Sequence, residues 1–151
     1  MRVLLTVALA ASVVLTGCGG GESDKQKAGE KQLAASGAPT PVCIGKAKDV
    51  AIPSAFPSAF PVPDGAKVYA VQQRSGGRTI VYAVVDRDVK TVLQQLQHDL
   101  PKAGFTPSEG EVEARDAESN WKGNGYTGRW AIREVAGCPE QTSVTVLSAK
   151  G

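Results

Sequence analysis

A single stretch of the chain has the apolar spacing of a helix, and this limits the folds that the chain can adopt. In residues 88–100, "DVKTVLQQLQHDL", apolar side chains recur three and four positions apart and form one stripe of a helix. They are Val89, Val92, Leu93, Leu96 and Leu100. Asp86 or Asp88 can cap the first turn, because a carboxylate there accepts from free N–H groups. We expect the helix to end between Pro101 and Gly104.

The segments on either side of this helix have the composition and alternation of β-strands. Strands are expected at residues 66–73, 79–86, 126–135 and 142–149. Gly76 and Gly77 supply the positive φ of a hairpin turn between the first two. Residues 105–125 do not divide clearly into strands and loops. The sequence thus predicts an α+β fold, in which one amphipathic helix covers one face of an antiparallel sheet of four or five strands, in the order ββαβββ.

Residues 52–65, "IPSAFPSAFPVPDG", contain four prolines, which exclude a regular helix and a central strand. A proline-rich docking segment is one interpretation of this stretch. Its prolines never have the Pro-x-x-Pro spacing that matches a three-residue polyproline turn. We favour an extended strap, whose Phe56 and Phe60 cover one edge of the core.

The N-terminus has the pattern of a processing signal. Arg2 is followed by an uncharged apolar segment, Val3 to Leu15, and then by small residues. As a helix these residues would span about 20 Å, whereas the hydrocarbon core of a membrane is about 30 Å thick. The segment is therefore too short for a comfortable transmembrane anchor, and we assign residues 1–17 to a signal peptide.

The four residues Leu15-Thr16-Gly17-Cys18 resemble the lipobox of bacterial lipoproteins: Leu, a small residue, Gly or Ala, then Cys. This resemblance implies that the Cys18 thiol receives a diacylglyceryl group and that Cys18 begins the mature chain. Two or three acyl chains hold a protein stably at a membrane, whereas one holds it marginally. An ordinary secretory signal with a chance cysteine is the alternative. The Ala/Val/Gly-rich chain is similar to lipoproteins of high-GC Gram-positive, actinobacterial-type bacteria.

The resemblance also sets the domain organisation. Residues 18–41 are small, polar and balanced in charge, so they cannot bury enough surface to offset their ordering entropy. We interpret them as a lipid-anchored flexible linker with a root-mean-square reach of about 25 to 30 Å. Residues 42–151 then form a single globular domain. The localisation that follows is the extracytoplasmic face of the cell membrane, with membrane lipid as the first partner.

With Cys18 acylated, Cys43 and Cys138 remain in a compartment where thiols oxidise. We expect these two cysteines to form a disulfide, although two free thiols are the alternative. A thiol-redox enzyme usually carries both cysteines in one Cys-x-x-Cys motif, and neither Cys43 nor Cys138 lies in such a motif.

The remaining chemistry points away from catalysis and nucleic acid. Charge is nearly balanced, with 17 Lys+Arg against 15 Asp+Glu, so no field of one sign is available to hold a polyanion. His98, the only histidine, lies opposite the apolar helix stripe. Gly123, Gly125 and Gly128 satisfy G-x-G-x-x-G but precede a strand pattern, which favours a glycine-rich loop over a dinucleotide site. We expect no metal, no cofactor and no enzymatic activity.

Trp121, Arg129 and Arg133 are the candidate contacts for a ligand or partner. Exposed aromatic and Arg side chains suit glycan or peptide binding. The alternation in residues 126–135 predicts Tyr126, Trp130 and Ile132 in the core, and leaves Trp121 as the expected exposed ring. Two functions follow as hypotheses. The first is a non-enzymatic binding or scaffolding domain at the cell envelope, and the second is an accessory or inhibitory subunit that docks on a protein partner through the open sheet face.

Overall fold

The structure is a computed structural model that describes residues 37–151. The predicted signal peptide (1–17), Cys18 and most of the predicted linker (18–41) lie outside the described residues. The folded domain is the unit Pro39–Gly151.

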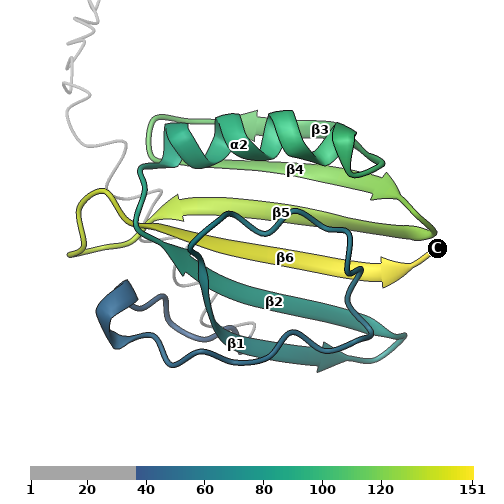
Figure 1. Cartoon of the computed structure of the whole chain (residues 1–151), viewed down its shortest axis with the longest axis horizontal. Coiled ribbons are helices and arrows are strands. Elements are labelled where there is room, and N and C mark those ends of the chain that lie inside the picture. The colour runs from purple at the N-terminus through teal and green to yellow at the C-terminus, as the bar shows by residue number, and fades with distance from the viewer. Residues whose placement is uncertain (1–36) are drawn as a thin grey trace, which may run out of the picture. The chain divides into compact units, whose positions relative to one another are not determined.

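Six strands form one antiparallel sheet in the spatial order β1-β2-β6-β5-β4-β3 (Figure 1). Their bounds are β1 Lys67–Arg74, β2 Arg78–Val85, β3 Phe105–Val112, β4 Asp116–Gly123, β5 Tyr126–Glu134 and β6 Thr142–Lys150. The last strand in the sequence, β6, pairs with both β2 and β5 and so joins two hairpins into one sheet. The predicted class, α+β with an antiparallel sheet and one α-helix, is confirmed for the described residues.

The predicted number and order of strands, four or five in the order ββαβββ, are wrong. Residues 105–125 form a further hairpin, β3–β4, so the order is ββαββββ. Two features conceal this hairpin in the sequence. The core side of β4 starts with the small residues Ala117 and Ser119, and β3 carries a bulge between Pro107 and Gly110 that shifts its register. Neither strand therefore has a clean apolar alternation.

The single α-helix, α2 (Val89–Lys102), matches the predicted stripe. Asp88 is its N-cap, and its carboxylate accepts from the Thr91 N–H at 3.0 Å. The helix ends at Lys102, and Gly104 follows with a φ of 82°. Both ends are as predicted. Of the stripe, Val89, Val92, Leu96 and Leu100 are buried, and Leu93 packs partly buried against the same core. The helix lies against β3, β4 and β5.

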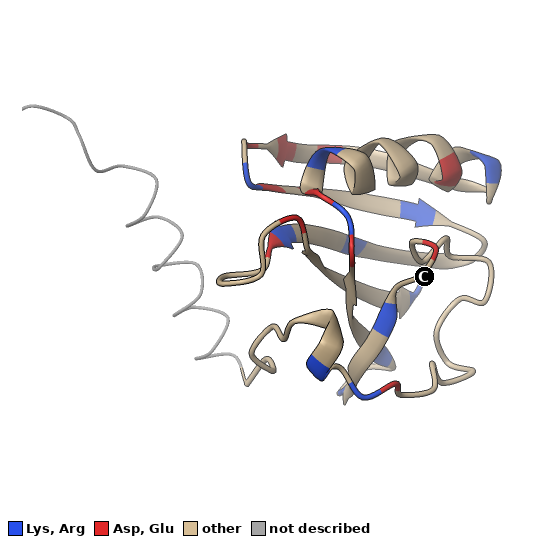
Figure 2. Ribbon diagram, turned by 60° about the vertical axis from the view of Figure 1, so that its left-hand side comes forward, with Lys and Arg blue, Asp and Glu red and all other residues tan. Residues whose placement is uncertain are grey.

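A strap formed by residues 51–65 lies over the same face of the sheet as α2 (Figure 1). Phe56 and Phe60 are buried, and the Phe60 ring lies 5.0 Å from the Trp121 ring and 5.6 Å from the Phe105 ring, measured between centroids. The predicted strap is confirmed, and its two rings belong to the main core. The strap is tan over most of its length in Figure 2, because Asp64 is its only charged residue. We call the face beneath α2 and the strap the covered face.

A smaller apolar cluster lies on the other face, at one end of the sheet. The predicted Cys43–Cys138 disulfide is present there, with the two Cα atoms 5.9 Å apart. It packs with Val84 and Val135, and with Ile44 of the short 3₁₀-helix η1 (Ile44–Lys46). The disulfide therefore joins the segment before the strap to the loop between β5 and β6.

Removing this disulfide is expected to lower stability markedly. The bond closes a loop with a sequence separation of 95 residues, for which the chain-entropy model gives about 4 to 5 kcal/mol. Cys43→Ala/Cys138→Ala, or reduction of the natural protein, should lower the midpoint of thermal unfolding measured by circular dichroism. The double variant supplies the control, because reductant should not change its midpoint. An unchanged midpoint for the reduced natural protein would contradict the prediction.

Candidate binding face

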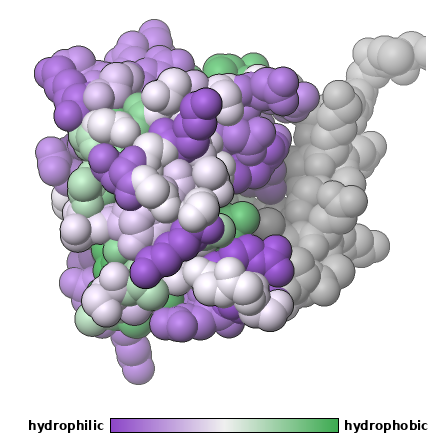
Figure 3. Space-filling view, turned by 90° about the vertical axis from the view of Figure 1, so that its right-hand side faces the viewer, coloured by the Kyte–Doolittle hydropathy of each residue, from purple (hydrophilic) through white to green (hydrophobic). Residues whose placement is uncertain are grey.

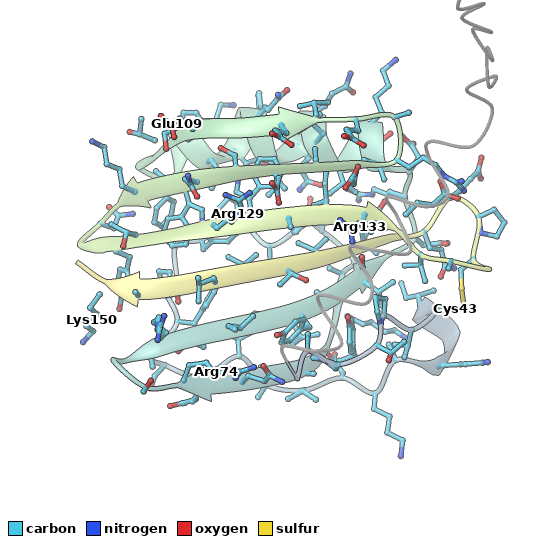
Figure 4. All side chains as sticks on the ribbon, turned by 180° about the vertical axis from the view of Figure 1, so that it is seen from behind. Cys43, Arg74, Glu109, Arg129, Arg133 and Lys150 are labelled. Atoms are coloured by element: carbon cyan, nitrogen blue, oxygen red, sulfur yellow. A yellow bond between two sulfur atoms is a disulfide. The ribbon has the colours of Figure 1, made fainter. Side chains whose placement is uncertain are left out.

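The face of the sheet opposite α2 carries the candidate arginines. The Trp130 and Ile132 side chains of β5 are buried on the covered face. Because side chains alternate along a strand, Arg129 and Arg133 lie on the opposite face. Figure 4, which views the sheet from behind, shows both labelled arginines on the near side of β5. We call this side the open face, defined by Tyr82, Arg129, Ala131, Arg133 and Thr145. Among the described residues, η1 and the disulfide lie at one end of it.

Both arginines are oriented by polar side chains of the neighbouring strand β4. Arg133 Nη2 lies 3.0 Å from a carboxylate oxygen of Asp116, its direct register partner. Arg129 donates to the amide oxygen of Asn120 at 3.2 Å and pairs with the Glu118 carboxylate. Partly exposed pairs of this kind contribute about 0 to 1 kcal/mol each to stability. Their larger effect here is to hold two guanidinium groups in fixed directions along one side of the sheet.

Short side chains lie between these arginines and the tyrosine side of the face. Ala131 of β5 is the register partner of Thr145 of β6, and Thr145 is in turn opposite Tyr82 of β2. Ala131 and Thr145 are half-buried. The open face therefore has a strip of short side chains, bordered by guanidinium groups on one side and aromatic rings on the other.

Two tyrosines form the aromatic border: Tyr69 is half-buried, whereas Tyr82 is buried with 3% of its surface exposed, so Tyr69 is the ring that a partner could reach. The rings of Tyr69 and Tyr82 lie 6.3 Å apart between centroids, and the Tyr82 hydroxyl donates to Gln72 Oε1 at 3.1 Å. Arg74 donates to the same oxygen at 2.7 Å. Burial raises the pKa of Tyr69 to about 12 and also raises the pKa of Tyr82. Both hydroxyls therefore remain neutral hydrogen-bonding groups at any physiological pH.

Trp121, expected to be an exposed contact, is instead in the core, with 2% of its surface exposed. Asn124 and Gly125 have φ values of 50° and 75° and form a two-residue turn, which pairs Gly123 with Tyr126 and Trp121 with Gly128. This register places Trp121 on the covered face. A Cβ at Gly128 would lie 2.5 Å from Cζ2 of Trp121, so the glycine leaves the space that the indole occupies. The Asn-Gly pair was the sequence signal that could have predicted this register.

The two arginines are thus brought to one face as predicted, and Trp121 is not. Tyr69, Tyr82 and Thr145 were not among the predicted contacts. In β2, Tyr82 lies within an apolar run in which both faces are buried, so its direction could not be read from alternation. Tyr69 lies at a register shift in β1, between Val68 and Ala70.

The other candidate chemistry is scattered. In the G-x-G-x-x-G pattern, Gly123 ends β4, Gly125 lies in the β4–β5 turn and Gly128 lies in β5, so the pattern leads into a strand as predicted. His98 lies on the solvent side of α2, where its ring contacts Asp99 at 2.7 Å and Lys102 at 2.9 Å. Its hydrogen bond lowers the pKa of Asp99. Within residues 37–151, no three His, Cys, Asp or Glu side chains are grouped to hold a metal ion.

The exposed large hydrophobic residues of the described surface are three: Val50 and Ile52, two residues apart at the start of the strap, and Val112 at the end of β3. The side of the domain seen in Figure 3 is mostly hydrophilic, with its hydrophobic residues in small separate areas. A shallow hollow at the N-terminal end of α2 is lined in part by Asp88, Lys90 and Glu134. In the described part of the chain, no helix is both long and apolar enough to cross a membrane.

Comparison with protein-family models, with curated proteins and with solved structures finds no match to this chain in any of the three. The function must therefore be argued from the residues of the chain itself.

The tyrosine border predicts a loss of stability at high pH. A free tyrosine has a pKa of 10.0 and folded Tyr69 has one of about 12, so the folded state retains a proton that the unfolded state loses. This contribution to stability is complete below pH 10 and is lost as the pH rises from 10 to 12. The free energy of unfolding in urea should fall between pH 9.5 and pH 11.5, and Tyr69→Phe should reduce the fall.

Spectrophotometric titration at 295 nm provides an independent check of this prediction. Tyr69→Phe should lack an absorbance step near pH 12 that the natural protein has. Tyr82→Phe is the matched control, since it removes the neighbouring ring and leaves Tyr69 in place. An absorbance step near pH 12 that persists in Tyr69→Phe would show the assignment to be wrong.

Proposed function

We propose that the protein is a lipid-anchored, non-enzymatic domain that binds or scaffolds a partner at the extracytoplasmic face of the cell membrane. The observation that carries this proposal is the open face: Arg129 and Arg133 are held in fixed directions beside short side chains and two tyrosines. Tyrosine and arginine are the residue types that contribute most to contacts with protein and glycan partners. Because the guanidinium groups are already oriented, binding would cost less side-chain entropy.

The anchoring part of the proposal rests on the lipobox-like residues Leu15 to Cys18. Acylation of Cys18 would keep the domain at the membrane surface, and the linker would hold it clear of the lipid headgroups. The disulfide is consistent with this location, because disulfides persist in oxidising compartments.

A second candidate function uses the same face. An accessory or inhibitory subunit would dock the open face on one membrane or secreted protein. Short side chains along Ala131 and Thr145 favour this function, because they would let the backbone of a partner approach the sheet closely. A single stoichiometric protein captured by crosslinking would favour the subunit, whereas captured cell-wall polymer would favour the envelope binder.

The anchoring proposal is tested by Cys18→Ala. In cell fractionation, the natural protein should be in the membrane fraction and should gain the mass of a diacylglyceryl group. The variant should move to the medium or stay unprocessed, because it lacks the thiol that is acylated. Natural protein that is processed but carries no added lipid mass would contradict the anchoring proposal without affecting the binding proposal.

The binding proposal is tested by Arg129→Ala/Arg133→Ala with crosslinking in intact cells. The double variant should reduce partner capture at least tenfold, because it removes both oriented guanidinium groups. The matched control, Lys90→Ala/Lys102→Ala, removes the same charge from exposed positions of α2, on the other side of the sheet, and should leave capture unchanged. Equal losses in the two double variants would show that net charge matters and that the open face does not.

A further inference from the structure

The strap is held over the covered face by apolar packing alone. Its backbone hydrogen bonds are local, for example from Phe56 N–H to the Pro53 carbonyl and from Phe60 N–H to the Pro57 carbonyl, both at 3.0 Å. Residues 51–65 donate and accept no hydrogen bond with the described sheet or with α2. The strap can therefore leave the sheet without breaking a hydrogen bond, in contrast to every strand.

Two hydrogen-bond donors are buried without a partner in the core to which the strap rings belong. Trp121 and Trp130 are 2% and 3% exposed, and the Nε1 atoms of both lack a hydrogen-bond partner within the described structure. A buried indole N–H is usually bonded, because leaving it unpaired forfeits its interaction with water. Two unpaired donors in one core lower the stability of the fold, and apolar packing gives no reason for them.

The two indoles are neighbours in the sheet. Trp121 of β4 is opposite Gly128, and Trp130 of β5 is two residues further along, opposite Ser119. Diagonal residues on one face of paired strands lie about 7 to 8 Å apart, so the two indoles start from neighbouring positions of the covered face. Phe60 of the strap contacts the Trp121 ring and Phe105.

The lining of this region defines the chemistry that it could bind. The main-core residues that pack with the two indoles are apolar, and the buried polar residues on the same face of the neighbouring strands, Ser119 and Ser148, carry uncharged hydroxyls. A charged ligand would therefore lose its hydration there without an ion pair to compensate. An apolar ligand with an acceptor oxygen would match both the lining and the two N–H groups.

We propose that the strap is a displaceable cover over a ligand site, and that an uncharged apolar molecule bearing a carbonyl group binds in place of Phe56 and Phe60. Its carbonyl oxygen accepts hydrogen bonds from the indole N–H groups of Trp121 and Trp130. The strap rings fill the site when no ligand is bound, which keeps the rings of Phe105, Trp121 and Trp130 out of water. This site lies on the face opposite the proposed partner contact, so either proposal can fail without the other.

Benzophenone is a suitable probe, because it is an uncharged diaryl ketone that crosslinks to nearby C–H bonds under ultraviolet light. The natural full chain is labelled over a range of concentrations, and the labelled peptides are mapped by mass spectrometry. We expect saturable labelling of the peptides that contain Phe105 and residues 117–130. Diphenylmethane has a methylene group in place of the carbonyl. It should compete at least fivefold more weakly than unlabelled benzophenone does, because one net hydrogen bond alone is worth about that factor and the carbonyl oxygen accepts two.

Two pairs of substitutions separate a binding site from an ordinary core. Trp121→Phe/Trp130→Phe keeps aromatic rings and removes both N–H groups, so the half-saturating benzophenone concentration should rise at least fivefold. Phe56→Ala/Phe60→Ala weakens the cover, so that concentration should fall at least fivefold. Ser54→Ala/Ser58→Ala, at exposed strap positions, is the matched control and should not change it.

Acrylamide quenching of tryptophan fluorescence provides a second readout, since Trp121 and Trp130 are the only tryptophans of the chain. Quenching should increase in Phe56→Ala/Phe60→Ala. If that variant fails to fold, the Trp→Phe pair decides, because it keeps both strap rings and an aromatic ring at each of the two positions. Labelling that does not saturate in the natural protein, or an unchanged half-saturating concentration in the folded Trp→Phe pair, would overturn the proposal.

Discussion

The domain depends on keeping one face of a six-stranded sheet dry. A sheet of this size has more apolar surface on that face than a single 14-residue helix covers, and α2 lies mainly against β3, β4 and β5. The strap covers further surface beside the helix, with Phe56 and Phe60 packed into the same core as the helix stripe. Without both covers, the indoles and the valines of β2 and β6 would be exposed to water, and the hydrophobic effect would not hold the sheet together.

This division of the sheet also determines what the other face can present. Side chains alternate along a strand, so each residue that points under the helix fixes the direction of its neighbours. In β5, burial of Trp130 and Ile132 leaves Arg129 and Arg133 together on the open face. The pairing of β5 with β4 then supplies Asp116 and Glu118 on that face as partners for the guanidinium groups. The arrangement of the open face is thus a consequence of how the core is built.

Much of this architecture could be predicted from the sequence because its signals are local. The stripe from Val89 to Leu100 identified the helix, the glycines at 76 and 77 identified the first hairpin, and the prolines identified the strap. The Cys43–Cys138 pair followed once Cys18 was assigned to the membrane. Pairing of β3 with β4 could not be predicted, because small residues face the core in β4 and a bulge interrupts β3. The direction of the Trp121 side chain was wrongly predicted for the same reason, since it depends on the register of β4 with β5.

The disulfide between Cys43 and Cys138 has a mechanical consequence. Residues 44–137 all lie within the loop that it closes, including the strap, α2 and strands β1 to β5. Tension applied to the chain from its N-terminal side reaches Cys43 and passes through the sulfur atoms to Cys138, beside the central strands β5 and β6. The strap and the edge strand β1, which could otherwise be peeled away one after the other, carry none of this load. A pull on the N-terminal side of Cys43 therefore loads the centre of the sheet and leaves the cover of the core without tension.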